Sequence, residues 1–254
     1  MTHSLVIVPT HDERDNIVPF ISAVLSVAPF IHVLIVDDAS PDGTGIIADE
    51  LARAESRIHV MHRSAKLGLG TAYIEGFRFA LAHGYERIIE MDADFSHQPK
   101  DLLCLLEATD SADVAIGSRN IPGGRVEGWS LLRRCISKGG SLYTRALLGI
   151  PIRDCTSGFK CFRREVIANI DLDQITSNGY GFQVEMNYLC HRAGFRIVEI
   201  PIVFLNRTIG ASKMSQSIVV EAGKVVWRLR QGRNSVPAGL RGAKQTRAVQ
   251  SRLI

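Results

Sequence analysis

Short apolar runs alternate with longer segments of helical periodicity along the first 118 residues. The apolar runs predict strands at residues 5–8, 32–36, 58–61, 87–91 and 114–116. The periodic segments between them predict helices at residues 16–27, 43–54, 73–81 and 99–106. Apolar strands joined by crossover helices indicate a parallel sheet covered on both faces, and such sheets bind ligands at the carboxyl ends of their strands. We therefore expect the functional residues at that edge.

The pattern changes beyond Ser118, and we expect the second half of the chain to cap the sheet. It predicts helices at residues 131–148 and near 182–190, a strand at 196–204 and an amphipathic helix at 215–231. The tail that follows carries basic residues and no acidic ones. The predicted organisation is a main domain at residues 1–213, an amphipathic helix at 214–233 and a basic, disordered tail at 234–254.

The composition excludes several classes of protein. Of 254 residues, 46% are hydrophobic and 22% are charged, which excludes a disordered chain, a collagen and a coiled coil. The 30 basic and 26 acidic residues give a net charge of +4, which is too small to favour nucleic acid as a partner. The 5 cysteines are scattered without a C-x-x-C pair, which favours a reducing compartment over a disulfide framework or a zinc site.

The sequence also bears on location. No secretory signal is recognisable, because residues 1–4 lack a basic region and the apolar run at 5–8 is short. The uncharged stretch at 18–36 approaches the length of a membrane span, but Pro29 divides it into a helix and a strand. We therefore expect no transmembrane helix and a place in the cytosol.

Asp92 and Asp94 follow the fourth predicted strand. Two carboxylates there suit one divalent ion such as Mg²⁺ or Mn²⁺, or one ion and a sugar hydroxyl. A calcium EF-hand loop is excluded, because His97 stands where that loop needs Gly and Leu103 where it needs Glu. Two alternatives stay open. One is the aspartyl nucleophile of dehalogenase-like phosphatases, although that motif normally ends the first strand, and the other is a pair that only bounds a turn.

A second acidic pair ends the second predicted strand, at residues 37–38. Asp38 is the candidate for a ribose or base contact, whereas Asp42 and Thr44 are typical of a turn and a helix cap. Glu13 follows the first predicted strand and reaches the same edge of the sheet. These side chains predict a nucleoside site.

Basic side chains lie in several of the predicted loops that follow the strands. Lys66 begins a glycine-containing loop that fits either a phosphate loop or a plain strand-to-helix turn, and Tyr73 excludes the dinucleotide fingerprint. Arg119 follows the fifth predicted strand, and Arg207 and Lys213 lie in a loop after the last one. Ordinary solvated cations are the alternative. Acidic strand ends and basic loops on one nucleotide-binding edge together favour a metal and a diphosphate.

Six short motifs occur in order along the chain. They are Pro9-Thr-x-x-Glu13, Val36-Asp37-Asp38-x-Ser-x-Asp-Gly, Lys66-x-Gly-Leu-Gly, Met91-Asp-Ala-Asp-Phe-Ser-His-x-Pro, Gly117-Ser-Arg119 and Asn206-Arg-x-x-Gly-x-Ser-Lys213. In order and spacing they resemble the dolichyl- or polyprenyl-phosphate mannose synthases, inverting glycosyltransferases of family 2, from Leu5 to about Lys213. The resemblance implies an α/β protein with the GT-A nucleotide-diphospho-sugar transferase fold, a mostly parallel central sheet flanked by helices. It also implies metal-dependent transfer of mannose from GDP-mannose to dolichyl or polyprenyl phosphate, giving the β-mannosyl phosphate and GDP.

The resemblance assigns roles position by position. Around guanosine it places Pro9, His11, Glu13, Val36 and Asp38, and around the diphosphate, metal and sugar it places Asp92, Ala93 and Asp94. It brings Arg119, Arg207 and Lys213 to phosphates or mannose, with Asp94, Arg119 and Lys213 as the catalytic set, and Lys66 as a further substrate cation. The chain departs from the family at two positions: His11 stands where Tyr is common, and Ser96, at the third metal position, stands where Gln is common.

The candidate residues for contact with the acceptor and with a membrane lie in the second half of the chain. The segment at 129–149 combines basic and apolar residues, and we expect Arg133 or Arg134 to meet the acceptor phosphate. The amphipathic helix and basic tail favour a peripheral enzyme at the cytoplasmic face of a membrane, with a separate anchoring protein left open. Two other functions stay open: a sibling enzyme that uses UDP-glucose or another sugar nucleotide, and a non-catalytic subunit that binds a nucleotide sugar.

Overall fold

The computed structural model describes residues 3–206 and 216–232. Its strands are β1 (Ser4–Thr10), β2 (Ile31–Asp37), β3 (Ile58–His62), β4 (Arg87–Glu90), β5 (Val114–Ser118), β6 (Arg125–Val126), β7 (Lys160–Arg163), β8 (Ile197–Pro201) and β9 (Val203–Phe204). Its α-helices are α1 (Arg14–Leu25), α2 (Thr44–Ala54), α3 (Leu69–Ala82), α4 (Leu102–Ser111), α5 (Leu131–Leu148), α6 (Arg164–Asn169), α7 (Gly179–Arg192) and α8 (Gln216–Gln231). Short 3₁₀ turns occupy Pro99–Asp101 and Leu172–Gln174.

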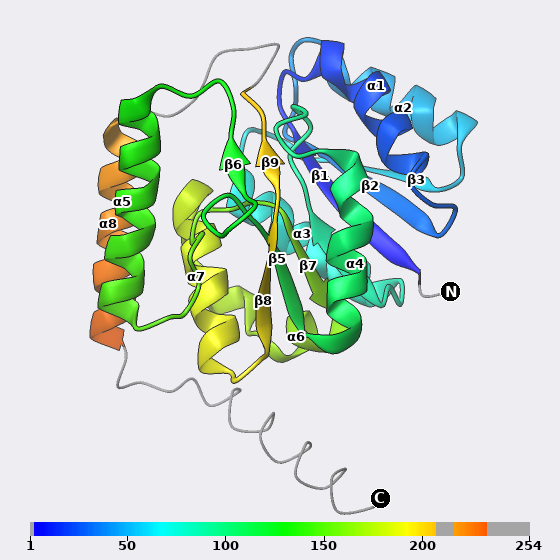
Figure 1. Ribbon diagram of the computed structural model, residues 1–254. Coiled ribbons are helices and arrows are strands. Elements are labelled where there is room, and N and C mark those ends of the chain that lie inside the picture. Colours follow the sequence, from blue (N-terminus) through cyan, green and yellow to red (C-terminus); the bar gives the residue numbers. More distant parts are fainter. Residues whose placement is uncertain (1–2, 207–215, 233–254) are drawn as a thin grey trace, which may run out of the picture.

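Within the described residues, one seven-stranded sheet has the order β3-β2-β1-β4-β7-β5-β8 (Figure 1). All of its strand pairs are parallel except those of β7, which runs antiparallel to both β4 and β5. The prediction of a mostly parallel sheet flanked by helices is confirmed. The sequence did not predict β7, because a four-residue strand with Lys160 and Arg163 at its ends has no continuous apolar pattern.

The predicted strand at residues 196–204 is in fact two strands. Pro201 ends β8, and after Ile202 the chain leaves the main sheet as β9, which pairs with β6 in a separate two-stranded sheet. Strand β6 and helix α6 were not predicted, because both are too short for a periodic pattern. The small β6–β9 ribbon brings residues 125–126 and 203–204 together beside the ends of the main strands (Figure 1).

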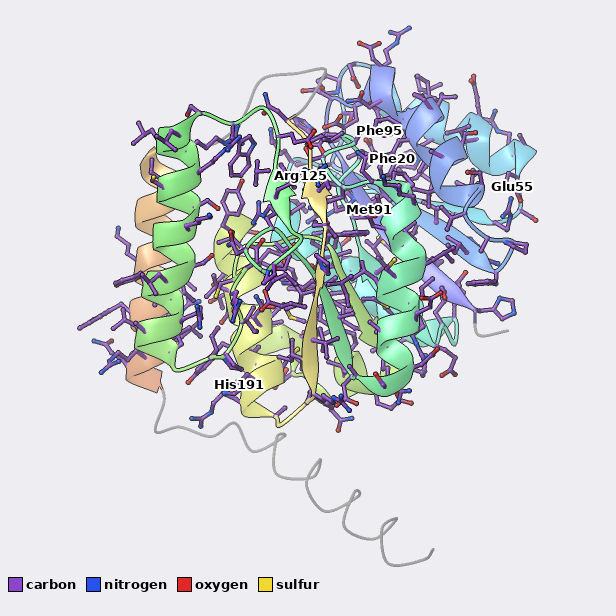
Figure 2. All side chains as sticks on the ribbon, in the orientation of Figure 1. Phe20, Glu55, Met91, Phe95, Arg125 and His191 are labelled. Atoms are coloured by element: carbon purple, nitrogen blue, oxygen red, sulfur yellow. The ribbon has the colours of Figure 1, made fainter. Side chains whose placement is uncertain are left out.

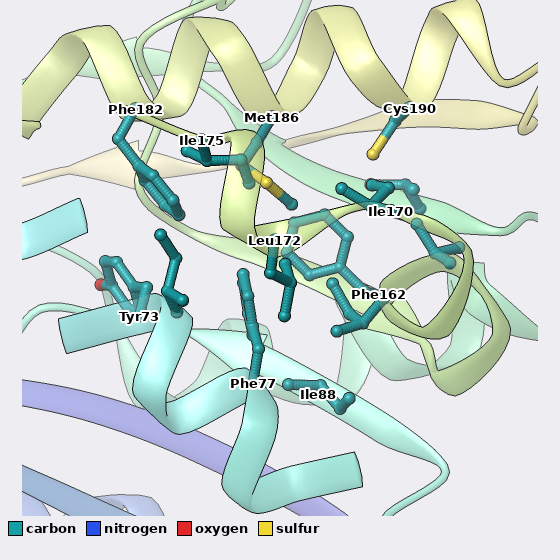
Figure 3. Close-up of a cluster of buried hydrophobic side chains, with 14 of the residues drawn as sticks. Tyr73, Phe77, Ile88, Phe162, Ile170, Leu172, Ile175, Phe182, Met186 and Cys190 are labelled. Carbon is teal, nitrogen blue, oxygen red and sulfur yellow. The ribbon is translucent and has the colours of Figure 1, made fainter. Parts of the chain in front are cut away.

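Side chains of β1 alternate between two hydrophobic cores. Leu5 and Ile7 pack with α3 and α7, whereas Val6 and Val8 pack with α1 and α4. In the first core, Tyr73 and Phe77 of α3 meet Phe182 of α7, and the Tyr73 and Phe182 rings stack at 5.8 Å (Figure 3). The two faces are therefore covered by helices, as a parallel sheet requires.

Helices α5 and α8 lie side by side at one flank of the molecule, next to α7 (Figure 1). Val225 and Val226 of α8 are buried in this packing, whereas Trp227 is exposed. Helix α8 falls inside the predicted amphipathic segment at 214–233, and the predicted tail at 234–254 lies outside the described residues. Among the helices that the structure describes, none has the length and apolar character needed to cross a bilayer.

Candidate active site

A cavity of about 320 Å³ lies at the carboxyl ends of β1, β2 and β4, the edge predicted to bind ligands. Most of the predicted site residues line it. These are Pro9, His11, Glu13, Asp38, Lys66, Asp92, Ala93, Asp94, Ser96, Arg119 and Arg133. The structure therefore brings together strand ends that are far apart in the sequence.

The backbone turn after β4 holds Asp94. Phe95 adopts φ 58°, a left-handed conformation that non-glycine residues rarely take, and it packs edge-on against Phe20 of α1 at 5.3 Å (Figure 2). This turn lets the Ser96 amide donate to Asp94 Oδ1 at 3.0 Å. Strain of this kind costs about 1–3 kcal/mol and is found where a site needs its geometry fixed.

The donor set of this turn fits Mg²⁺ or Mn²⁺. Asp92 and Asp94 offer hard carboxylate oxygens, and Asp92 Oδ1 also accepts from the Tyr73 hydroxyl at 3.4 Å. No cluster of three acidic, histidine or cysteine side chains suited to a metal occurs in the part of the chain that the structure describes. Mg²⁺ is commonly held by one or two carboxylates together with substrate phosphates and water, so two aspartates suffice.

His97 lies against the same turn and is almost fully buried. Its ring stacks on Phe159 at 5.0 Å and meets Phe204 edge-on at 5.2 Å. Burial lowers the pKa of His97 to about 4, with Asp94 opposing the shift. The imidazole is therefore neutral near pH 7 and packs between rings.

The predicted nucleoside contacts are held by hydrogen bonds at the ends of β1 and β2. His11 Nδ1 lies 3.1 Å from the Asp38 carbonyl oxygen, and Glu13 accepts from the Asn16 side chain at 2.8 Å. The Asp38 carboxylate accepts from buried Arg63 at 2.5 Å. Sequence reasoning did not single out Arg63, which lies 25 residues beyond Asp38.

Glycines in the loop at 66–70 serve packing. A Cβ on Gly70 would lie 2.6 Å from the Ser177 carbonyl oxygen, so only glycine allows this approach. The Gly68 amide donates to Asp38 Oδ2 at 3.2 Å, and Lys66 lines the cavity. These contacts favour a strand-to-helix turn over a phosphate loop.

Arg119 lines the cavity, and Asp154 holds it in place. Arg119 Nε and Nη2 donate to the two Asp154 carboxylate oxygens at 2.7 and 2.6 Å, and the Arg119 amide donates at 2.9 Å. Burial alone lowers the pKa of Arg119, but Asp154 more than offsets this and raises it. Trp129 and Phe204 flank the guanidinium at 5.7 and 5.1 Å from their ring centres.

The two residues predicted to contact the acceptor phosphate differ in their position relative to the cavity. Arg133 lines the cavity, with its guanidinium 4.0 Å from the centre of the Trp129 ring and 3.4 Å from Asn206 Oδ1. Arg134 is exposed and does not line the cavity. Geometry thus favours Arg133 for this role.

Of the other predicted residues, Val36 is described and does not line the cavity. Val36 is fully buried in the core against α3, because its side chain points to the face of the sheet that α3 covers. The side chain of Val36 therefore does not face the cavity, and the placement of this residue around guanosine stays a prediction. Arg207 and Lys213 lie outside the described residues, so their roles stay predictions.

Helix α7 contributes a wall of the cavity that the sequence did not predict. Asn178, Gly179, Tyr180, Gly181 and Gln183, at the start of α7, all line it. The amino end of a helix carries a partial positive charge and free amides, which suit an anion. Gly179 and Gly181, in the first turn of this helix, were the available signal.

The chain is similar to known glycosyltransferases. The model for "Glycosyl transferase family 2" matches residues 5–171. The chain belongs to glycosyl transferase family 2. It is 49% identical over 221 residues to polyprenol monophosphomannose synthase of Mycolicibacterium smegmatis, covering 86% of this chain and 83% of that one. It is 50% identical over 218 residues to undecaprenyl-phosphate mannosyltransferase of Micrococcus luteus, covering 86% and 90%.

Solved structures of this fold agree with the GT-A prediction. Glucosyl-3-phosphoglycerate synthase from Mycobacterium tuberculosis aligns with a TM-score of 0.62 at 15% identity, covering 91% of this chain and 80% of that one. The mannosyltransferase PcManGT from Pyrobaculum calidifontis, in complex with GDP-Man and Mn²⁺, aligns with a TM-score of 0.53 at 14% identity, covering 98% and 80%. At such identities the likeness concerns the fold alone.

Proposed function

We propose that this protein transfers mannose from GDP-mannose to a polyprenyl phosphate, giving polyprenyl β-mannosyl phosphate and GDP. The observation that carries the proposal is identity of about 50% to two polyprenyl-phosphate mannosyltransferases over most of both chains. The cavity agrees with it, because Asp92 and Asp94 face the same space as Arg119 and Arg133. Carboxylates there suit a metal and hydroxyls, and guanidinium groups suit phosphates.

The transfer is an in-line displacement at the anomeric carbon of mannose. An oxygen of the acceptor phosphate forms the new bond to this carbon, and the bond to the β-phosphate of GDP breaks with its electron pair leaving on GDP. The second pKa of a phosphate monoester is about 6, so near pH 7 the acceptor is already largely dianionic. No general base is required, and attack opposite to the leaving group inverts the configuration.

Different residues of the cavity would bind the metal, the leaving diphosphate, the acceptor and the nucleoside. Asp92 and Asp94, with Ser96 beside them, would hold Mg²⁺ or Mn²⁺, which supplies Lewis-acid stabilisation of the leaving diphosphate. Arg119 is fixed by Asp154, so its charge needs no reorganisation as negative charge develops on GDP. Arg133 stands at the acceptor side. His11, Glu13 and Asp38 surround the nucleoside end.

Attachment to a membrane surface is part of this proposal. Leu131 and Leu132 of α5 are 76% and 71% exposed, with Arg134 and Lys138 on the same helix. Apolar and basic side chains side by side suit a peripheral contact with anionic lipid, such as that of the cytoplasmic leaflet of a membrane. Flotation with vesicles that contain anionic lipid, compared with neutral vesicles, tests this contact.

The direct test is one incubation of the purified full chain with radiolabelled GDP-mannose, undecaprenyl phosphate and Mn²⁺ or Mg²⁺. Label extracted into organic solvent, with GDP in the aqueous phase, is the expected result. A parallel incubation with radiolabelled UDP-glucose distinguishes the sibling enzyme, which would release UDP instead. A nucleotide-sugar-binding subunit would bind GDP-mannose and leave the organic phase unlabelled with both donors.

A further inference from the structure

A second cavity, of about 330 Å³, lies among helices α5, α7 and α8. We call it the apolar slot. Its lining residues are Arg119, Trp129, Ile136, Ser137, Gly139, Gly140, Tyr143, Thr144, Thr156, Tyr180, Val184, Gly223 and Val226. Arg119, Thr156 and Tyr180 also line the first cavity, so the slot adjoins the site proposed for the sugar donor.

The lining of the apolar slot suits an apolar ligand. Arg119 is the only charged side chain among its lining residues in the described chain, and its contact with Asp154 holds it at one end of the slot. Trp129, also in the lining, is 8% exposed, and its indole N–H makes no hydrogen bond within the described residues. The end next to Arg119 is therefore polar, whereas the rest of the slot has little to offer a charged ligand.

Three helical glycines keep the slot open. Gly139 and Gly140 lie in the middle of α5 and Gly223 lies in α8, where glycine costs about 1 kcal/mol relative to alanine. No atom lies within 4 Å of a Cβ built on any of the three. They are thus not needed for close helix packing, unlike Gly70, and their effect is to leave the space unfilled.

The slot continues to the exposed apolar side of α5. Ile136, Gly139, Gly140 and Tyr143 recur at helical spacing, so they share one face of α5. Ile136 and Tyr143 are 41% and 46% exposed, so the slot reaches the surface between them. Leu132, one turn before Ile136, is 71% exposed and extends the same stripe.

We infer that the apolar slot holds the part of the polyprenyl chain nearest the phosphate, with the phosphate at the Arg119 end, and that Gly139, Gly140 and Gly223 admit it. This inference rests on the proposed function. The two cavities share lining residues, and this identifies the occupant of the slot. If the phosphate of the acceptor lies in the first cavity, its hydrocarbon chain must leave that cavity, and the apolar slot adjoins it. The exposed stripe on α5 then leads the chain towards the lipid surface.

Filling the slot tests this assignment. Gly140→Leu places a side chain in the open space and raises the helix propensity of α5, so the variant should fold. We expect its KM for undecaprenyl phosphate to rise at least about tenfold, the effect of a 1.4 kcal/mol loss, while the KM for GDP-mannose stays within about twofold. Gly140→Ala should give a smaller rise. Cys135→Leu is the matched control, because Cys135 is exposed on α5 outside the slot.

A binding assay separates this inference from the proposed function. The chain has 2 tryptophans, so Trp227→Phe leaves Trp129 as the reporter in the slot. Titration with undecaprenyl phosphate in detergent should change Trp129 fluorescence, and Gly140→Leu should abolish the change. Wild type that binds the lipid in this way but transfers no mannose would contradict the proposed function alone. Gly140→Leu that uses and binds undecaprenyl phosphate like wild type would overturn the slot.

Discussion

The buried pair of Arg119 and Asp154 gives the sharpest prediction. Asp154 is fully buried and Arg119 is 6% exposed. Asp154→Asn keeps the shape of the side chain but removes its charge and turns one acceptor oxygen into a donor that faces the guanidinium. Removing one partner of such a pair costs about 3–5 kcal/mol, because a buried charge is left uncompensated. We expect a loss of this size in the free energy of unfolding.

Urea denaturation of wild type and Asp154→Asn measures this loss. The matched control is the double variant Arg119→Met/Asp154→Leu, which removes both charges and should recover most of the stability. Activity should separate from stability: the double variant should fold yet transfer mannose at least about a hundredfold more slowly, as removal of one preorganised group that stabilises charge commonly does. A loss of less than about 1 kcal/mol for Asp154→Asn would refute the argument that Asp154 sustains Arg119.

Two further predictions concern buried titratable groups. The pKa of His97 falls from 6.5 to about 4 on folding, so its contribution is fully present above pH 6.5 and is lost as pH falls towards 4, about 3 kcal/mol at 1.36 kcal/mol per pKa unit. Urea denaturation of wild type and His97→Gln across pH 4–7.5 should show this slope only in wild type, and parallel curves would contradict it. Lys160 and Glu90 are both fully buried, with Lys160 Nζ 3.9 Å from Glu90 Oε2. Lys160→Met should cost about 3–5 kcal/mol, and the double variant with Glu90→Gln should regain most of it, whereas equal melting temperatures for both would argue against the pair.

The parts of the site that could be predicted from the sequence are those that local patterns position. Apolar runs locate the strands, and parallel strands gather their carboxyl ends at one edge, so Asp38, Asp92 and Asp94 were expected to share a cavity. Residue types then indicate chemistry. The family resemblance also named Val36, but a motif alone does not indicate which face of the sheet a side chain occupies, and the Val36 side chain lies in the core.

The parts that could not be predicted depend on contacts between distant segments. Asp154 meets Arg119 across 35 residues, and no spacing rule connects them. The antiparallel strand β7 is too short to produce a pattern, yet it inserts between β4 and β5 in the centre of the sheet. The apolar slot needs α5, α7 and α8 together, so its glycines have no meaning until those helices pack.

In the proposed function, the aspartates after β4 hold a metal-bound sugar nucleotide in this cavity. Calorimetric titration of GDP-mannose into wild type and Asp94→Asn, each with Mn²⁺ and with a chelator, measures this role. We predict that Mn²⁺ tightens binding to wild type at least about tenfold, or 1.4 kcal/mol, and that Asp94→Asn keeps the metal-free affinity but loses this gain. Equal Mn²⁺ dependence of GDP-mannose binding in the two proteins would contradict a role of Asp94 in holding the metal.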